Sequence, residues 1–124
     1  MEFSSDQLDI KDNPELSENC LHFRFKGKFT VQTSIEGTQA WAQEFDSNPK
    51  TNYCMLWDCS EMTGFEPAAR KEWYNCMTKY KGRIKEVNVI AKNLIIRGAA
   101  KVMLEFFGLK SRVVKSMDEL LVEA

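Results

Sequence analysis

The sequence of 124 residues lacks the short motifs that mark several large enzyme classes. It has no GxxxxGK[ST] or GxGxxG loop for binding phosphates, no GxSxG turn of a serine hydrolase and no HExxH helix of a zinc protease. Its one histidine, His22, lies on the polar side of an alternating segment and is expected to be exposed. We therefore predict a protein that is not an enzyme, with no catalytic residue and no cofactor.

Other absences concern cysteine spacing, long apolar runs and net charge. The four cysteines lack the paired Cys/His spacing of a zinc site, so no metal is predicted. The N-terminus is acidic and has no export signal, so the thiols are expected to be reduced and the location cytoplasmic. The apolar stretch 94–109 contains three charged residues, which argues against a transmembrane segment. A formal net charge of −1 argues against nucleic acid as a partner.

What is present is an alternation of strand-like and helix-like segments, which is typical of one α/β domain over residues 1–124. The predicted strands are 7–10, 20–29, 53–57, 86–91 and 112–116. The predicted helices are 33–45, 67–81, 94–107 and a last one after 116. This order favours a mixed, mainly parallel β-sheet flanked by helices, with right-handed crossovers and an antiparallel first pair of strands.

Polar residues at the predicted helix ends support these boundaries. Thr33 or Ser34 is expected to cap the first helix, because a side-chain oxygen can accept a free N–H of the first turn. Pro67 suits the first position of the second helix, where its missing N–H costs nothing. Asn93 and Ser116 are expected to cap the third and fourth helices.

The stretch LWDCSEMTGFEPAARKEW, residues 56–73, predicts a strand, then a loop, then a helix. Ligands of open α/β sheets bind where strands end, so this loop is the first place to search for a site. Asp58 ends the strand and is expected to accept an N–H from Ser60 or Glu61, as Asp does in turns. Asp58 also has three functional alternatives. It could be a metal ligand, a general base, or an acceptor that orients a phosphorylated hydroxyl.

The hydroxyls of Ser60 and Thr63 have a structural and a functional interpretation. Local turn bonding is the simpler interpretation, because Ser and Thr favour such contacts. Phosphorylation is the alternative, since a phosphate there would lie near a helix N-terminus with Arg70 in reach. Gly64 is expected to supply a backbone angle that other residues resist. Cys59 is a further candidate, a nucleophile, but the sequence places no base beside it.

The predicted helix 94–107 is apolar over a wider arc than one sheet face covers. Its charged residues form a single narrow stripe of Arg97, Lys101 and Glu105. The remaining surface is expected to be covered by neighbouring helices, or to contact a protein partner, a second copy or an apolar ligand. The residues expected to line an apolar pocket are Ile95, Ile96, Met103, Phe106 and Phe107.

Three segments, YCMLWDCSEMTGF, GRIKEVNVIA and LIIRGAAKVM, together resemble the SpoIIAA-like family, relatives of the STAS domains of anti-sigma factor antagonists and sulfate transporters. The resemblance implies a single small STAS-like α/β domain. In the antagonists, a serine in a DSSG-like segment is the phosphorylation switch. Here Glu66 and Pro67 stand where the serine-bearing turn is expected, so no clear switch of this type is present. The family also looks like the lipid-binding Sec14-type domains in fold.

Together these features predict a cytoplasmic regulatory module that binds a protein partner or itself. Phe65 is expected to be the exposed anchor of the contact surface. The alternative is a carrier of a small apolar ligand such as a fatty acid, and an enzyme that uses Cys59 is the third hypothesis. The candidate partner-binding residues are Asp58, Ser60, Thr63, Gly64, Phe65, Glu66, Arg70 and Arg97.

Overall fold

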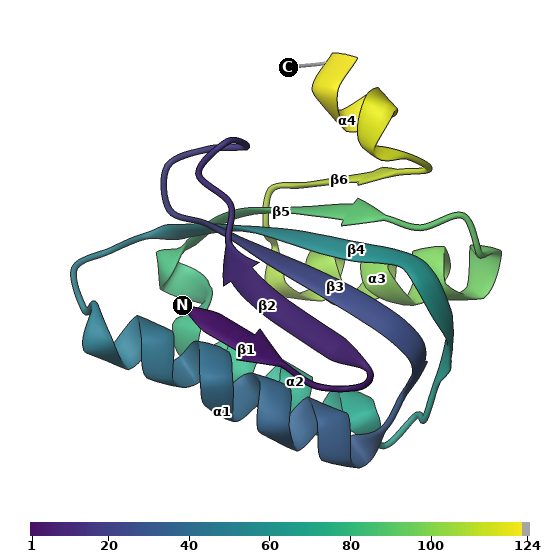
Figure 1. Ribbon diagram of the computed structural model, residues 1–124, viewed down its shortest axis with the longest axis horizontal. Coiled ribbons are helices and arrows are strands. Elements are labelled where there is room, and N and C mark those ends of the chain that lie inside the picture. The colour runs from purple at the N-terminus through teal and green to yellow at the C-terminus, as the bar shows by residue number, and fades with distance from the viewer. Residues whose placement is uncertain (123–124) are drawn as a thin grey trace.

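The strands lie side by side in the order in which they occur in the chain (Figure 1). The computed structural model describes residues 1–122. Pairing is antiparallel from β1 to β3 and parallel from β3 to β6, which confirms the predicted mixed sheet with an antiparallel edge. The strands are β1 (Glu2–Ser4), β2 (Leu8–Asp12), β3 (Cys20–Phe29), β4 (Tyr53–Phe65), β5 (Ile84–Ile90) and β6 (Ser111–Val114).

The three longer helices cover one face of the sheet, and the short C-terminal helix lies on the other (Figure 1). Every β–α–β connection moves one strand along the sheet in the same direction, so right-handed crossovers place all the connecting helices on one side. No helix within residues 1–122 has both the length and the apolar character needed to cross a bilayer. The helices are α1 (Val31–Ser47), α2 (Ala69–Tyr80), α3 (Leu94–Phe107) and α4 (Met117–Val122), with a 3₁₀ turn η1 (Lys81–Arg83) after α2.

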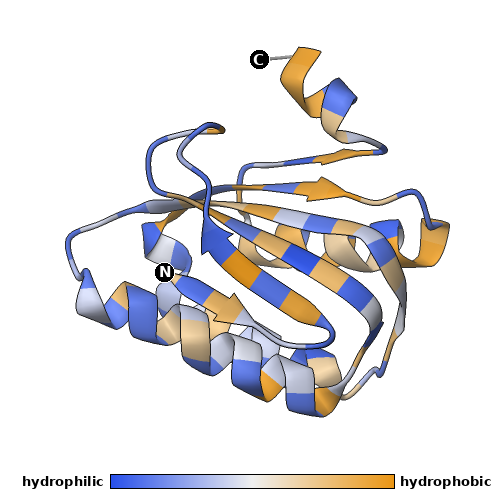
Figure 2. Cartoon of the chain, in the orientation of Figure 1, coloured by the Kyte–Doolittle hydropathy of each residue, from blue (hydrophilic) through white to orange (hydrophobic). Residues whose placement is uncertain are grey.

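The main core lies between the sheet and α1 to α3, and Trp73 of α2 is at its centre. Residues alternate in polarity along β2 and β3 (Figure 2). Buried apolar residues of these strands, among them Leu8, Ile10 and Phe23, belong to this core. Trp73 is buried, and its ring lies 5.5–6.1 Å from five other aromatic rings, each in an edge-to-face arrangement. These rings belong to Phe23, Phe25, Phe29, Trp41 and Trp57.

A second, smaller apolar cluster lies on the opposite face, under Leu120 of α4. It contains Cys54 and Leu56 of β4 together with Ile90 and Val114 of the two following strands. The first half of β4 is therefore covered on both faces, which explains its continuous run of apolar residues. The cap of α4 is also as predicted, because the Glu119 N–H donates to the Ser116 hydroxyl.

The predicted starts of α1 and α2 are both wrong. Thr30 caps α1, and its hydroxyl accepts the N–H of Thr33 at 3.2 Å. Ser34 is buried inside that helix and donates to the carbonyl of Ala69 at 2.6 Å, which ties α1 to α2. Pro67 lies before α2, which begins at Ala69, inside the turn in which the Ala69 N–H donates to the Glu66 carbonyl at 2.9 Å.

The predicted loop after Asp58 is also wrong, because β4 continues to Phe65. The second half of β4 also pairs with β3, and the last pair is Phe65 with Phe29. The register between the two strands shifts twice along this half. Each shift is a bulge that changes which side chains face the core, so the alternation expected of a strand is interrupted in the sequence.

Candidate functional site

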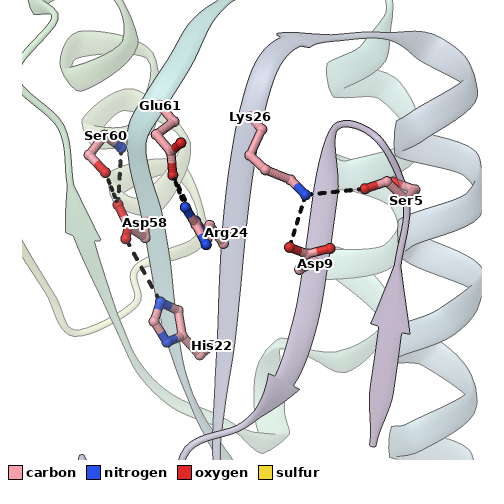
Figure 3. Close-up of polar contacts among 8 residues, drawn as sticks. All are labelled: Ser5, Asp9, His22, Arg24, Lys26, Asp58, Ser60 and Glu61. Carbon is pink, nitrogen blue, oxygen red and sulfur yellow. Dashed lines mark hydrogen bonds and ion pairs between the residues drawn. The ribbon is translucent and has the colours of Figure 1, made fainter.

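The open face of the sheet, opposite α1 to α3, carries the polar residues of β3 and β4 (Figure 3). Asp58 accepts two hydrogen bonds from Ser60, one from its N–H at 3.0 Å and one from its hydroxyl at 2.6 Å. The N–H contact confirms the hydrogen bond expected between Ser60 and Asp58, although both residues lie within β4 and not in a turn. Ser60 is exposed, so its hydroxyl is accessible while it is held by the carboxylate.

His22 lies next to Asp58 on this open face. Its Nε2 is 3.9 Å from Asp58 Oδ2, and its Nδ1 is 3.3 Å from the amide of Asn13. The expected exposure of His22 was wrong, because these two neighbours and the adjacent strands leave its side chain largely covered. The neighbouring imidazole and the hydrogen bonds from Ser60 lower the pKa of Asp58 to about 2.

Two cross-strand ion pairs complete the open face. Arg24 of β3 donates to Glu61 of β4 from its Nε at 2.7 Å, and Lys26 of β3 binds Asp9 of β2 at 2.9 Å (Figure 3). Both pairs are at least partly exposed, so they contribute little to stability but fix the positions of these side chains.

The polar residues of the open face do not form a nucleophile–base pair. The Ser60 hydroxyl donates to Asp58, and a carboxylate with a pKa of about 2 is a weak base at neutral pH. Cys59 points to the opposite, helix-covered face, where it is 7% exposed and burial raises its pKa to about 12. The thiolate that a nucleophilic cysteine requires is therefore disfavoured.

Within residues 1–122, no three His, Cys, Asp or Glu side chains come close enough together to hold a metal ion.

Of the candidate residues 63–65, one is exposed and the other two do not have the roles expected of them. Thr63 is exposed on β4. Gly64 adopts no positive φ, and a side chain there would meet no atom within 4 Å, so the backbone angle expected of it was wrong. Phe65 is partly buried beneath the guanidinium of Arg70, 5.5 Å away, and is therefore not the exposed anchor expected.

Glu66 and Arg97 hold the fold together at two element ends. Glu66 accepts the N–H of Val31 at 2.8 Å and so satisfies a free donor at the start of α1. Arg97 of α3 donates to the carbonyls of Ala91 at 3.3 Å and Val113 at 3.2 Å, next to the ends of β5 and β6. Sequence reasoning grouped both with the contact surface, because hydrogen bonds to distant main-chain atoms leave no pattern in the sequence.

An apolar cavity of about 70 Å³ lies between the end of β4, α2 and α3. Of the five predicted pocket residues, Ile96 and Met103 line it. Phe107 is buried against Tyr74, whereas Ile95 and Phe106 are exposed. Ligand sites usually enclose roughly 300–1,000 Å³. The cavity is thus too small for a fatty acid in this conformation.

Most of the large apolar side chains that are exposed within residues 1–122 lie on α3, on a surface that we call the outer face of α3. We use this name for Leu94, Ile95, Val102 and Phe106, which are 82%, 75%, 62% and 70% exposed. Ile95, Val102 and Phe106 are separated by seven and four residues, so they form one stripe along the helix. The wide apolar arc predicted for this helix is therefore not covered by neighbouring helices.

No family model matches the sequence, and no curated protein sequence matches it. Among the solved structures that are similar to it in fold are the following two. One is an uncharacterized protein from the DUF3478 family with a SpoIIAA-like fold from Shewanella loihica PV-4, with 18% identity, 98% of each chain covered and a TM-score of 0.73. The other is the anti-sigma factor antagonist SpoIIAA in its unphosphorylated form, with 8% identity, 94% of this chain and 96% of that chain covered, and a TM-score of 0.64.

Both likenesses extend over nearly the whole chain, although few residues are identical. At such identities the agreement concerns the path of the backbone and the arrangement of its elements. The fold class expected from the sequence is confirmed: the chain has the SpoIIAA-like α/β fold.

Proposed function

We propose that this chain is a non-enzymatic regulatory module that binds another protein chain through the outer face of α3. The observation that carries the proposal is the exposure of four large apolar side chains on one helix. Monomeric proteins rarely leave such a contiguous patch in water, and it marks interaction sites. One of the solved structures of similar fold is an anti-sigma factor antagonist, which supports a regulatory role here.

The absence of catalytic function is part of the same proposal. It is supported by the weak basicity of Asp58 beside Ser60 and by the burial of Cys59. We also propose a cytoplasmic location, supported by four cysteines that are all free thiols.

The contact surface that we propose differs from the one expected from the sequence. Phe65 and Arg70 adjoin α3 through the shared cavity and form the edge of the surface. Asp58 and Ser60 lie on the open face of the sheet, away from α3, so they belong to a separate surface.

The carrier of an apolar ligand is the second candidate function. The apolar lining of the cavity beside Ile96 and Met103 favours it, whereas the small volume counts against it. To take a fatty acid, α3 would have to move away from α2.

Native mass spectrometry of gently purified protein tests the proposal. We expect an assembly containing a second protein chain, identical or different, that is lost in Val102→Glu, because a charge at the centre of an apolar contact is costly. Leu121→Glu is the matched control, since Leu121 is a 55% exposed apolar residue on α4. A monomer that carries a lipid-sized mass would support the carrier instead, and an assembly that persists in Val102→Glu would exclude this surface.

A further inference from the structure

Gly98 lies in the outer face of α3, three residues after Ile95 and four before Val102. Glycine in the middle of a helix destabilises it relative to alanine. A Cβ at Gly98 would meet no atom within 4 Å, and its φ is not positive, so nothing within the described chain requires glycine there. Close approach of another backbone is a reason for glycine at an exposed helical position.

We infer that the partner at the outer face of α3 is a second copy of this chain, packed antiparallel with the two α3 helices crossing at Gly98 and Val102. The inference rests on the proposed function and names the partner of that same surface. It describes a two-fold dimer, in which the same patch of each copy meets the other.

The order of large and small residues along the outer face of α3 is self-complementary. With the two-fold axis midway between Ile95 and Phe106, Ile95 of one copy lies against Phe106 of the other. Val102 then lies over the small surface of Gly98 and Ala99 of the second copy. Large side chains therefore pack over small ones at the crossing, as ridges pack into grooves.

The charged residues beside the apolar outer face of α3 also fit an antiparallel pair of helices. Lys101 and Glu105 are exposed next to the stripe, one base and one acid, so two such edges carry no net charge. In the antiparallel arrangement Glu105 lies along the N-terminal half of the second copy's α3, towards Lys92 and the positive end of the helix dipole. An anionic lipid surface is a poorer occupant, because Glu105 would face its headgroups.

The exposed apolar side chains of α3 supply part of the area that a dimer needs. Stable interfaces bury roughly 800 Å² on each partner. The four exposed side chains leave on the order of 100 Å² each in water, so they supply about half of that area as an apolar centre. The polar rim comes from Lys101, Glu105 and Arg70, which are exposed around them.

Sedimentation velocity from micromolar to submillimolar protein tests the dimer. We expect a reversible monomer–dimer equilibrium in the wild type, and dimerisation weakened roughly tenfold or more in Val102→Glu. Leu121→Glu, the matched control on α4, should dimerise as the wild type does. Equal weakening by both variants would overturn the assignment of the interface to α3.

The substitution Gly98→Ala should change the stability of the monomer and the affinity of the dimer in opposite directions. Alanine favours the helix, so the thermal midpoint of the dilute monomer should rise. The added methyl group at the crossing should weaken dimerisation several-fold, roughly as a misplaced methylene does in a packed core. A higher midpoint with unchanged dimerisation would show that no helix crosses at Gly98 and would overturn the proposed arrangement.

Failure of this inference is distinguishable from failure of the proposed function. A wild type that stays monomeric at every concentration overturns the dimer, and so does a monomer that instead partitions into phosphatidylglycerol vesicles. The proposed function is decided separately by native mass spectrometry, in which a different protein bound through Val102 would uphold it without a second copy.

Discussion

Asp58 keeps its charge to lower pH than an ordinary carboxylate does, because His22 lies beside it and Ser60 donates two hydrogen bonds to it. Its pKa is about 2, compared with about 3.9 for Asp in an unfolded chain. A carboxylate whose pKa is lowered on folding contributes stability that is present above about pH 4 and is lost as the pH falls through about 2. Asp58→Asn should therefore reduce the free energy of unfolding by about 1–2 kcal/mol at pH 7, allowing for partial exposure.

Urea denaturation at several pH values measures this effect. The difference between the wild type and Asp58→Asn should narrow steadily below about pH 4. Glu61→Gln on the same strand is the control, since its half-exposed ion pair with Arg24 should be worth less than about 1 kcal/mol. A difference that does not change with pH would mean that the charge of Asp58 is not stabilised by folding.

Arg97 should be a stabilising residue and not a contact residue. Arg97→Ala removes the two hydrogen bonds to the carbonyls of Ala91 and Val113, and should lower the free energy of unfolding by about 1.5–3 kcal/mol. Lys101→Ala, four residues further along α3 and exposed, should change it by less than about 0.5 kcal/mol. Equilibrium denaturation in guanidinium compares the two, and equal effects would contradict the structural role of Arg97.

Single-residue roles divide sharply into those that the sequence predicts and those that it does not. The bond between Asp58 and Ser60 was predictable because turn preferences act over two residues. The roles of Glu66 and Arg97 could not be predicted. Only the tertiary structure brings the donor of Val31 close to Glu66 and the acceptor of Val113 close to Arg97. Similarly, the coverage of His22 depends on Asn13, which comes from a separate segment of the chain.

Among the elements, α3 was predicted well and β4 was not. Asn93 caps the start of α3 as the sequence predicts, and the helix ends at Phe107 before Gly108, since both residues act within one helical turn. The end of β4 was misplaced because its polar second half resembles a loop, and because bulges at two positions break its alternation. Only pairing with β3, which is distant in sequence, makes that half a strand.

The cap of α3 gives a prediction for the whole element. Asn93 Oδ1 accepts the N–H groups of Ile95 and Ile96 at 2.9 and 3.2 Å. Asn93→Ala should lower the free energy of unfolding by about 1 kcal/mol, and Asn93→Asp should restore most of it. Amide hydrogen exchange should become faster in the first turn of α3 and stay unchanged in α1. Uniform acceleration along the chain would show that the loss is not local to the cap.

For the whole molecule, the buried thiols report on global opening. Cys59 is buried between the sheet and the helices, so its thiol should react only when the core opens. Pulsed alkylation in increasing urea, read by mass spectrometry, should label Cys59 in parallel with unfolding, and Cys76, which is partly exposed, earlier. Rapid labelling of Cys59 in the native protein would revive the hypothesis of a nucleophilic cysteine.

The order of the strands in the sheet has a consequence for synthesis of the chain. Each of β2 to β6 pairs with the strand that precedes it in the sequence. The pairing partner of every new strand has therefore already been synthesised when that strand leaves the ribosome. No earlier pairing has to be broken to admit a later strand. Nascent chains arrested at increasing lengths should therefore gain protease resistance in steps, beginning before β6 has been translated.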